Sequence, residues 1–460
     1  DMSMEPMSIR EIEKAVHGVW WNPREGEEEI ASVTTDSRNV PEGSLFIPIV
    51  GEKFDGHRFL DAALASGASG VLCAKLPEDL RPDKFYIKVS DTRVALKDLA
   101  RHYREKFTLP VVQITGSVGK TTTKDMIAAV LSRKYRVLKT AENFNNDIGV
   151  PLTLLQLDRS HEAAVIETGM NHFGEIRYLG EMVEPDIAVI SNIGDAHIEF
   201  LGSREGILKA KAEILENLRP GGTVILNGDD ALLNTLTPPF ETLRCGQGEN
   251  CAYRVGEIAD HGVDGITCCL TTPQGEYRLT IPAPGEHMVY SASMAAAIGE
   301  KLGLTAAEIA RGVACYTPTG SRMRVLRLPE ERTVLDDCYN ANPQSVTAAL
   351  EILAKTDCAQ RVAVLGDMGE LGDLTAQAHY NMGALAVMLG IDLVIAIGTH
   401  AAKIAEGVEC SGGEVRHFAT KEEALPTIRA QLTPQTAMLI KASHAMRFGW
   451  LVEALEQNYD

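Results

Sequence analysis

Residues 111–122 decide the fold of the middle of the chain, and they read Val-Val-Gln-Ile-Thr-Gly-Ser-Val-Gly-Lys-Thr-Thr. The apolar run Val111–Thr115 predicts a buried strand, and the apolar spacing over Thr121–Leu131 predicts a helix. Between them, Gly116 and Gly119 would let backbone N–H groups approach phosphate oxygens closely. A strand, a glycine turn and a helix in this order predict a phosphate-binding loop.

The residues after the turn indicate what the loop would do. Lys120 could reach the β- and γ-phosphates, and the Thr121 hydroxyl could bind Mg²⁺. Ile114 stands where the usual GxxxxGK[ST] pattern has its first glycine, so a tight turn with a surface lysine is the alternative. The hydroxyl run 121–123 favours phosphate, because β-branched residues bring no helix propensity to a first turn. We therefore predict an ATP-binding loop formed by Gly116, Ser117, Val118, Gly119, Lys120, Thr121 and Thr122.

Further strands are expected beside this loop, at Ala163–Glu167, Asp186–Ser191 and Thr223–Leu226. Helical patterns separate them, which is typical of a parallel sheet with crossover helices. Glu167 ends one strand and His197 follows the next, and the carboxyl ends of parallel strands meet at one edge of a sheet. A carboxylate and an imidazole at that edge are candidate Mg²⁺ ligands or bases, although either alone is commonly a plain strand-end acid or loop histidine.

The length of the chain, 460 residues, predicts about three domains of roughly 150 residues each. We expect a small N-terminal α/β domain over 1–107, a central P-loop-type parallel-sheet domain over 108–319 and a doubly wound Rossmann-like domain over 320–460. The Gly-, Thr- and Cys-rich text of 240–285 predicts an antiparallel annex. The last domain is predicted to alternate strands at Thr333–Cys338, Arg361–Leu365, Leu393–Ile397 and Ala437–Ile440 with helices at Ser345–Ala354, Thr375–Leu389, Lys421–Leu432 and Phe448–Gln457.

Charge and cysteine content exclude some classes of partner. The chain carries 44 Lys and Arg against 63 Asp and Glu, a formal net charge of −19, which argues against nucleic acids and anionic membranes as partners. Small anions need only a local positive site. Nine cysteines without a Cys-x-x-Cys pair favour reduced thiols in the cytosol. No apolar run reaches the roughly 18 residues of a membrane span, and no signal peptide pattern is present, so we expect a cytoplasmic protein.

Motifs along essentially the whole chain resemble the Mur ligase family of cell-wall precursor synthesis. The shortened phosphate loop of that family accounts for Ile114. The matching segments are Thr34–Arg38, Pro41–Phe46 and Gly51–His57 in the uridine-nucleotide domain, Gly116–Thr122 and Asn143–Pro151 in the central domain, and Asp336–Pro343 and Leu365–Gly372 in the C-terminal domain.

The resemblance implies an ATP-dependent amide ligase that forms ADP and phosphate through an acyl-phosphate intermediate. Leu365–Gly372 resembles the branch that joins D-alanyl-D-alanine to UDP-N-acetylmuramoyl-tripeptide in the cytoplasm. The alternatives are the branch that adds the third amino acid, a more remote folylpolyglutamate synthase-like ligase, in which Thr34–His57 would have no role, and, from another class, a catalytically silent nucleotide-binding or assembly partner. We expect a monomer with no nucleic-acid or membrane partner.

Metal and catalytic roles follow from the same resemblance. Thr121 and Glu167 would bind one Mg²⁺, and Glu167 and His197 would help to hold a second. Lys211 lies fourteen residues after His197, where the family has a lysine carbamylated by CO₂. Without the resemblance, a lysine on the amphipathic helix predicted over 206–218 would be expected to be solvated. The candidate catalytic residues are therefore Lys120, Glu167, His197 and Lys211.

The family's binding residues also match positions in this chain. Arg322, Asp337 and Asn340 would approach the nucleotide, and Ser37, Arg38, Asn145 and Asn146 would contact the UDP substrate. Two positions depart from the family pattern. Ser291 replaces an asparagine that contacts adenine, and His444 replaces an arginine.

Overall fold

The computed structural model describes residues 4–21, 23, 28–117, 119–193, 201–318 and 323–459. The chain folds into two compact units. The first contains residues 1–256, 270–277 and 290–316, and the second contains 257–269, 278–289 and 317–460. The domain boundaries predicted at 107/108 and 319/320 stay predictions. Within the described ranges, no helix has the length and apolar character needed to cross a bilayer.

The first unit begins with a five-stranded sheet in the order β2-β7-β6-β5-β4. Strands β4 to β7 are parallel, and β2 pairs antiparallel with β7. The bounds are β2 Val19–Trp21, β4 Val33–Thr34, β5 Leu45–Phe46, β6 Gly70–Cys73 and β7 Phe85–Lys88. Helices α1 (Ile9–Ala15) and α2 (Leu60–Ala65) accompany this sheet, and β1 (Met7–Ser8) pairs with β3 (Glu29–Ile30).

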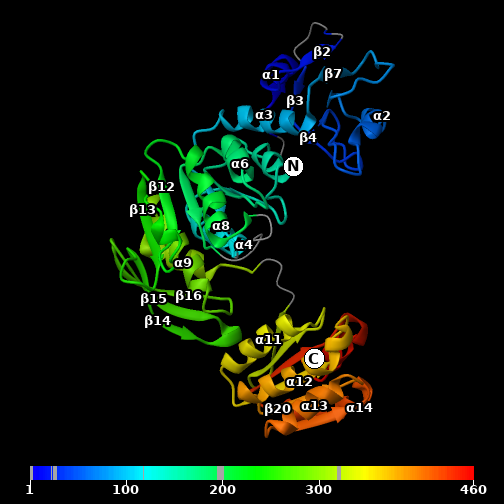
Figure 1. The fold of residues 1–460 in the computed structure, drawn as a ribbon, viewed down its shortest axis with the longest axis vertical. Helices are drawn as coiled ribbons and strands as arrows, with labels where there is room; N and C mark the ends of the chain where they lie inside the picture. Colours follow the sequence, from blue (N-terminus) through cyan, green and yellow to red (C-terminus); the bar gives the residue numbers. More distant parts are fainter. Residues whose placement is uncertain are drawn as a thin grey trace. The chain divides into compact units, whose positions relative to one another are not determined.

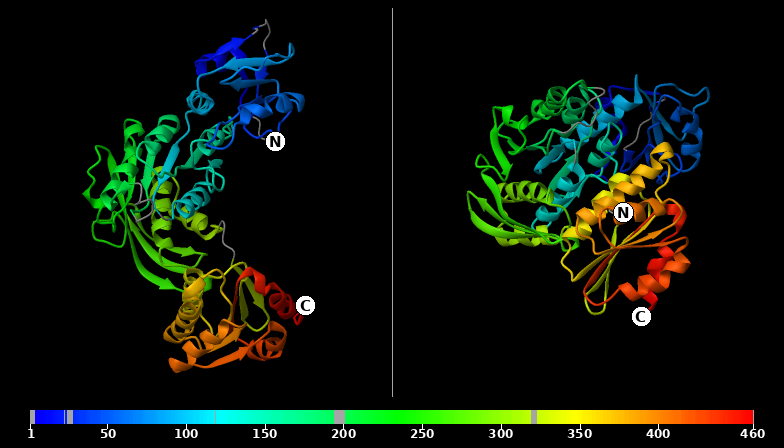
Figure 2. Two further views of the ribbon diagram at one scale, coloured as in Figure 1. Left: turned by 45° about the vertical axis from the view of Figure 1, so that its right-hand side comes forward. Right: turned by 60° about the horizontal axis from the view of Figure 1, so that its bottom comes forward.

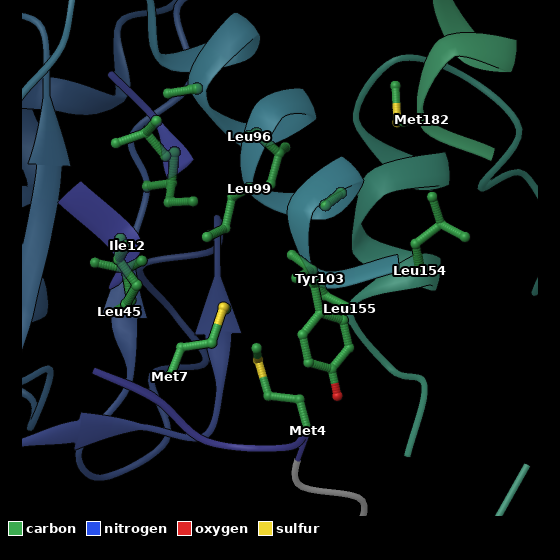
Figure 3. Close-up of a cluster of buried hydrophobic side chains, with 14 of the residues drawn as sticks. Met4, Met7, Ile12, Leu45, Leu96, Leu99, Tyr103, Leu154, Leu155 and Met182 are labelled. Carbon is green, nitrogen blue, oxygen red and sulfur yellow. The ribbon is translucent and has the colours of Figure 1, made fainter. Parts of the chain in front are cut away.

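Helix α3 (Thr92–Arg104) connects this sheet to the rest of the unit through one apolar core. Asp91 caps the helix by accepting hydrogen bonds from the N–H groups of Arg93 and Val94, as N-cap residues do. Leu96 and Leu99 lie between residues of the N-terminal sheet and residues of α5 (Gly149–Leu154) and α6 (Glu175–Val183), as Figure 3 shows. The core therefore continues past the predicted boundary at residue 107.

The central sheet has nine strands in the order β16-β15-β14-β13-β12-β11-β8-β10-β9. Figure 1 labels its strands β12 to β16. The pairs from β9 to β12 are parallel, as predicted. Buried strands β8 and β10 end beside each other, which brings the phosphate loop and Glu167 to one edge. The bounds are β8 Val111–Thr115, β9 Val137–Lys139, β10 Ala163–Glu167, β11 Ile187–Ile190 and β12 Thr223–Asn227, with helices α4 Lys120–Leu131, α8 Arg204–Lys211, α9 Met288–Lys301 and α10 Ala306–Ala314.

The annex predicted as antiparallel over 240–285 is partly wrong. Strand β13 (Glu241–Gly246) pairs parallel with β12, and β14 (Tyr253–Asp260) pairs parallel with β13. The physical reason is the loop between them, whose N–H groups at Gln247 and Gly248 donate to the Asp229 carboxylate at 2.8 and 2.9 Å. This anchor holds the chain so that β14 starts again in the same direction. Strands β15 (Ile266–Thr272) and β16 (Gly275–Ile281) complete the sheet.

The second unit contains a six-stranded sheet in the order β17-β18-β22-β19-β20-β21, parallel except for β17. Helices cover both of its faces (Figure 2), and each face has its own apolar core. The strands are β17 Arg324–Leu328, β18 Arg332–Asp337, β19 Gln360–Gly366, β20 Leu393–Ile397, β21 Val415–Phe418 and β22 Thr436–Lys441. The helices are α11 Pro343–Lys355, α12 Thr375–Met388, α13 Ala401–Cys410, α14 Lys421–Gln431 and α15 Gly449–Gln457.

A short segment of the annex, residues 260–264, belongs to this second unit and is fastened to α11 and β17. Arg327 pairs with Asp264 at 2.5 Å, and the His261 ring lies 3.0 Å from the Asp357 carboxylate. The N–H of Val263 donates to the Thr356 hydroxyl at 3.2 Å. Segment 260–264 is therefore packed as part of the C-terminal unit although it comes from the annex.

Candidate active site

The phosphate loop lies between β8 and α4, as the sequence predicts. Gly119 adopts φ +76° directly before the helix, a conformation that favours glycine. Gly116 packs so closely that a Cβ on it would lie 1.8 Å from the Ser191 hydroxyl oxygen. The N–H of Ser117 donates to the Asn192 side chain at 3.0 Å, which fixes the loop against the strand-end of β11. Lys120 opens α4, so its ammonium adds to the partial positive charge of the helix N-terminus.

Glu167 lies beside this loop with both carboxylate oxygens held. The Thr121 hydroxyl donates to Oε1 at 2.9 Å, and the Asn145 side-chain amide donates to Oε2 at 2.9 Å. Thr121 and Glu167 are therefore brought together as predicted for a shared metal ligand set. A hydroxyl and a carboxylate oxygen are suitable ligands for Mg²⁺, so the donor chemistry fits.

Lys211 is buried at the C-terminal end of α8, with 2% of its surface exposed. The solvated lysine expected from helix amphipathicity alone is wrong here, and the resemblance points to the correct environment. Burial, and to a smaller extent the charge of Lys120, together lower the pKa of Lys211 to about 7. A substantial fraction of Lys211 is therefore an unprotonated, nucleophilic amine near neutral pH.

Three of the expected site residues, Val118, His197 and Arg322, lie outside the described residues. Among the residues that are described, no group of three or more His, Cys, Asp or Glu side chains is arranged to hold a metal. The second metal ligand set, which needs His197, stays a prediction.

The predicted UDP-binding residues Ser37 and Arg38 line a cleft of about 560 Å³ in the N-terminal sheet. The rings of Phe54 and Phe59 stack with centroids 5.8 Å apart at this cleft, and the Arg58 guanidinium lies over both rings. Arg38 is highly exposed, with only Asp36 as an ion-pair partner in the described chain. The cleft therefore combines flat apolar rings with a cation directed to solvent.

The other two residues predicted to contact the UDP substrate have different surroundings. Asn145 contacts Glu167, whereas the Asn146 side chain accepts hydrogen bonds from the N–H groups of Ile148 and Gly149 and so shapes the start of α5. Asn146 also lines a cleft of about 510 Å³ with Gly169 and Tyr178. Gly169, one of its lining residues, follows Glu167 by two positions in the sequence.

The C-terminal nucleotide residues predicted from the sequence lie together in the second unit. Lys441 pairs with Asp337 at 2.8 Å and donates to the Asn340 carbonyl at 2.9 Å. These residues line a cleft of about 370 Å³ at the start of α11. The ring of His444 lies 5.8 Å from the ring of Tyr339. Contact of this cleft with nucleotide stays a prediction.

Two residues of the phosphate site were not predicted from the sequence. Lys124 is buried one turn into α4, and Asn192 anchors the loop. The only sequence signal was the position of Lys124 at the end of the Thr121–Thr123 run. The departure at Ser291 also has a structural role, because its buried hydroxyl lies 2.8 Å from that of Thr123 and so connects α9 to the phosphate helix.

Comparison with known proteins gives this fold and site a family. Residues 29–104 match the model described as Mur ligase family, catalytic domain, and 114–299 match the Mur ligase middle domain. Residues 321–444 match the Mur ligase, glutamate ligase domain. The chain belongs to the Mur ligase family, whose members are ligases.

Within that family, the chain is similar over nearly its whole length to UDP-N-acetylmuramoyl-tripeptide–D-alanyl-D-alanine ligases. It is 37% identical to the one from Bacillus subtilis, over 97% of this chain and 98% of that protein. It is 36% identical to the one from Escherichia coli, over 93% of this chain and 94% of that protein.

Solved structures agree with the sequence comparisons. A crystal structure of MurF from Acinetobacter baumannii superposes with a TM-score of 0.80 at 33% identity, covering 99% of this chain and 100% of that one. A MurF ligase from Thermotoga maritima, solved in complex with ADP, gives a TM-score of 0.70 at 26% identity, covering 93% and 97%. The α/β architecture expected from the sequence is confirmed.

Proposed function

We propose that this protein uses ATP to join D-alanyl-D-alanine to UDP-N-acetylmuramoyl-tripeptide in the synthesis of peptidoglycan precursors. The observation that carries the proposal is the phosphate loop with Thr121 and Asn145 each donating a hydrogen bond to the Glu167 carboxylate. The near full-length similarity to ligases named for this reaction supports it. A cytoplasmic location and a monomeric state belong to the same proposal.

The reaction has two steps. The terminal carboxylate of the tripeptide attacks the γ-phosphorus of ATP, which breaks the bond to ADP and gives an acyl phosphate. The amine of D-alanyl-D-alanine then attacks the acyl carbon, expels phosphate, and loses a proton to give the amide. Both steps keep all atoms within the substrates and products, so the protein has to position charges rather than supply a group.

Electrostatic repulsion is the main obstacle to the first step. At 4 Å and an effective dielectric constant of 20, two like unit charges cost about 4 kcal/mol. Lys120, the loop N–H groups and the start of α4 supply positive potential against this repulsion. Mg²⁺ held by Thr121 and Glu167 would neutralise phosphate charge.

We propose that Lys211 is carbamylated by CO₂ and serves as a further metal ligand. The lowered pKa of Lys211 supports this, because only an unprotonated amine can attack CO₂. Addition forms an N–C bond, and the amine loses one proton as the carbamate anion forms. A buried neutral amine thus becomes a buried anion, with one proton released to solvent; from the protonated lysine two protons are released in all.

The two clefts of the first unit suggest where the UDP substrate lies. We assign uracil to the cleft with Ser37, Arg38 and the Phe54–Phe59 stack, because flat aromatic rings pack on a planar base. We assign the distal peptide to the cleft at Asn146 and Gly169, because that cleft begins beside Glu167. In this arrangement the tripeptide carboxylate reaches the phosphate loop.

Phosphate release tests the proposed function. With ATP and UDP-N-acetylmuramoyl-tripeptide, we expect release on addition of D-alanyl-D-alanine and none on addition of lysine, diaminopimelate or single D-alanine. Release with UDP-N-acetylmuramoyl-dipeptide and a diamino acid would instead identify the branch that adds the third residue.

Substitution at the phosphate loop provides the matched control for this assay. Lys120→Ala should lower kcat by about 100-fold or more, because it removes a charge aimed at the transferred phosphate. Lys134→Ala, beyond the end of the same helix, should keep normal turnover, since the described contacts of Lys134, the Gly303 carbonyl and the Tyr135 ring, lie outside the phosphate loop. Equal activity of the two variants would contradict the assignment of the loop.

A further inference from the structure

Lys124 is a buried lysine next to the candidate metal site, and nothing in the proposed reaction uses it. It lies on α4 with 2% of its surface exposed. Its ammonium donates to the Thr140 carbonyl at 2.7 Å and lies 3.5 Å from the Asp125 carboxylate and 3.8 Å from Oε1 of Glu167. Both carboxylates are themselves buried. A charged side chain in such a place is expensive unless its partners are fixed.

The partners of Lys124 are fixed by the fold and do not depend on any ligand. Thr140 directly follows β9, and its hydroxyl accepts a hydrogen bond from the N–H of Glu167 at 2.9 Å. Its carbonyl accepts from Lys124. The same residue therefore holds both the backbone of Glu167 and the ammonium that faces the Glu167 carboxylate. Thr140 therefore fixes the positions of Lys124 and Glu167 relative to each other.

The charges around Lys124 balance. Two buried carboxylates, Asp125 and Glu167, face two ammonium groups, Lys124 and Lys139, with Lys139 lying 3.1 Å from Asp125. A divalent cation approaching Glu167 therefore meets a carboxylate whose charge is already compensated, with a fixed positive charge behind it. Metal would be attracted strongly only when another anion arrives. The triphosphate of ATP is such an anion.

We propose that Lys124 is a positioning residue that makes divalent metal binding at Glu167 depend on nucleotide. This inference rests on the proposed function, because it takes Glu167 as a ligand of the metal that accompanies ATP. Lys124 faces the Glu167 carboxylate with a fixed positive charge in the nucleotide-free enzyme. The metal then enters as a nucleotide complex, and free divalent cations do not occupy the site beforehand.

Binding of Mn²⁺, followed by electron paramagnetic resonance of the free ion, tests this directly with the full-length protein. The wild type should bind Mn²⁺ weakly alone and tightly with a non-hydrolysable ATP analogue, measured as the loss of free Mn²⁺ beyond that caused by the analogue in a protein-free control. Lys124→Met, which keeps an unbranched side chain one heavy atom shorter and removes the charge, should bind Mn²⁺ at least tenfold more tightly in the absence of nucleotide. Lys124→Gln should raise the nucleotide-free Mn²⁺ affinity in the same way, and it replaces the methionine variant in the test if that variant does not fold.

Two further variants separate charge from packing. Lys124→Arg keeps the charge and should restore the weak, nucleotide-dependent binding of the wild type. Lys139→Met removes an equal charge that is paired with Asp125 and not with Glu167, and should raise the nucleotide-free Mn²⁺ affinity clearly less than Lys124→Met does. A purely structural role for Lys124 would give no increase in nucleotide-free affinity in either neutral variant, and that result overturns the inference.

The same Mn²⁺ titration distinguishes failure of the role of Lys124 from failure of Glu167 as a metal ligand. Normal nucleotide-dependent Mn²⁺ binding in every variant would reject the role of Lys124 and leave the metal site intact. Absence of Mn²⁺ binding even with the ATP analogue, in the wild type as in the variants, would reject Glu167 as a metal ligand and the inference with it.

Discussion

Lys211 shows how strongly one residue's chemistry depends on where the chain buries it. In water its amine would be almost fully protonated at neutral pH. Burial at the end of α8, with Lys120 nearby, lowers its pKa to about 7. Helix position could not predict this, because a lysine on an amphipathic helix has the same sequence pattern whether its tip reaches solvent or a polar cleft. Only the family resemblance singled it out.

The lowered pKa gives a pH-dependent prediction. Because CO₂ adds only to the neutral amine, carbamate occupancy at Lys211 should be high above pH 7 and fall as the pH drops through about 7, where the amine becomes protonated. Carbon-13 NMR of the protein in ¹³C-bicarbonate should show this as a carbamate resonance. Lys211→Arg, which cannot form the carbamate, should lack the resonance. A wild-type spectrum identical to that of the arginine variant at pH 8 would refute the modification.

At the scale of elements, the strand–loop–helix unit of the phosphate site depends on two glycines for different reasons. Gly119 needs its left-handed backbone conformation but has open space around it. Gly116 has no room, because Ser191 at the end of β11 lies against it. Gly119 is required by the backbone conformation of the turn, and Gly116 is required by the close packing of Ser191 against the loop.

Because the two glycines are required for different reasons, a second substitution at Ser191 should restore activity to a Gly116 variant but not to a Gly119 variant. Gly116→Ala should lower kcat/KM for ATP by about 100-fold, since the methyl group would push the loop off its Ser191 contact and misplace the phosphates. Adding Ser191→Ala should recover part of the loss, because the clashing oxygen is gone and the remaining Cβ contact, 3.1 Å, is merely tight. Gly119→Ala should lose only about tenfold or less, from roughly 1 kcal/mol of backbone strain, and should gain nothing from Ser191→Ala. Steady-state ATP kinetics distinguish these outcomes.

The sequence predicted most central and C-terminal elements within one or two residues at each end. Strands β8, β10 and β20 have the predicted bounds, because each is a short apolar run closed by polar residues. Helix α13 (Ala401–Cys410) and strand β21 were missed. Strand β21 has exposed positions on an edge of the sheet, so its sequence lacks a buried run. The parallel pairing of β13 and β14 depends on a distant anchor, Asp229, which no local pattern reveals.

The site was predictable to the extent that its residues sit in local motifs. Lys120, Thr121 and Glu167 could be placed together, because strand ends in a parallel sheet share an edge. Lys124 and Asn192 could not, because nothing in their local sequence distinguishes a lysine buried against Glu167, or an asparagine that holds the loop, from solvent-exposed residues. The same holds for Ser291, whose hydroxyl reaches an α4 residue 168 positions away.

At the scale of the whole molecule, the chain divides into two units and passes between them after residues 256, 269, 277, 289 and 316. The phosphate loop and Glu167 belong to the first unit, and Asp337, Asn340 and Lys441 belong to the second. We propose that both groups serve one ATP molecule, and we then expect its binding to involve closure of the two units.

Closure predicts a change that small-angle X-ray scattering can measure. The radius of gyration should fall when a non-hydrolysable ATP analogue and UDP-N-acetylmuramoyl-tripeptide are added together, because both units then share one ligand set. Lys120→Ala should weaken the response, since it removes a contact to the phosphates. An unchanged radius in the wild type at saturating ligand would count against closure.

The fastening of residues 260–264 to α11 and β17 has a consequence for how this protein can be recombined with its relatives. Asp264, Val263 and His261 find their partners at Arg327, Thr356 and Asp357, all within the C-terminal unit. A chimera that exchanges only 317–460 would match these groups with foreign partners. The transferable module is therefore discontinuous, and a working hybrid should also carry residues 257–269 and 278–289 from the same parent.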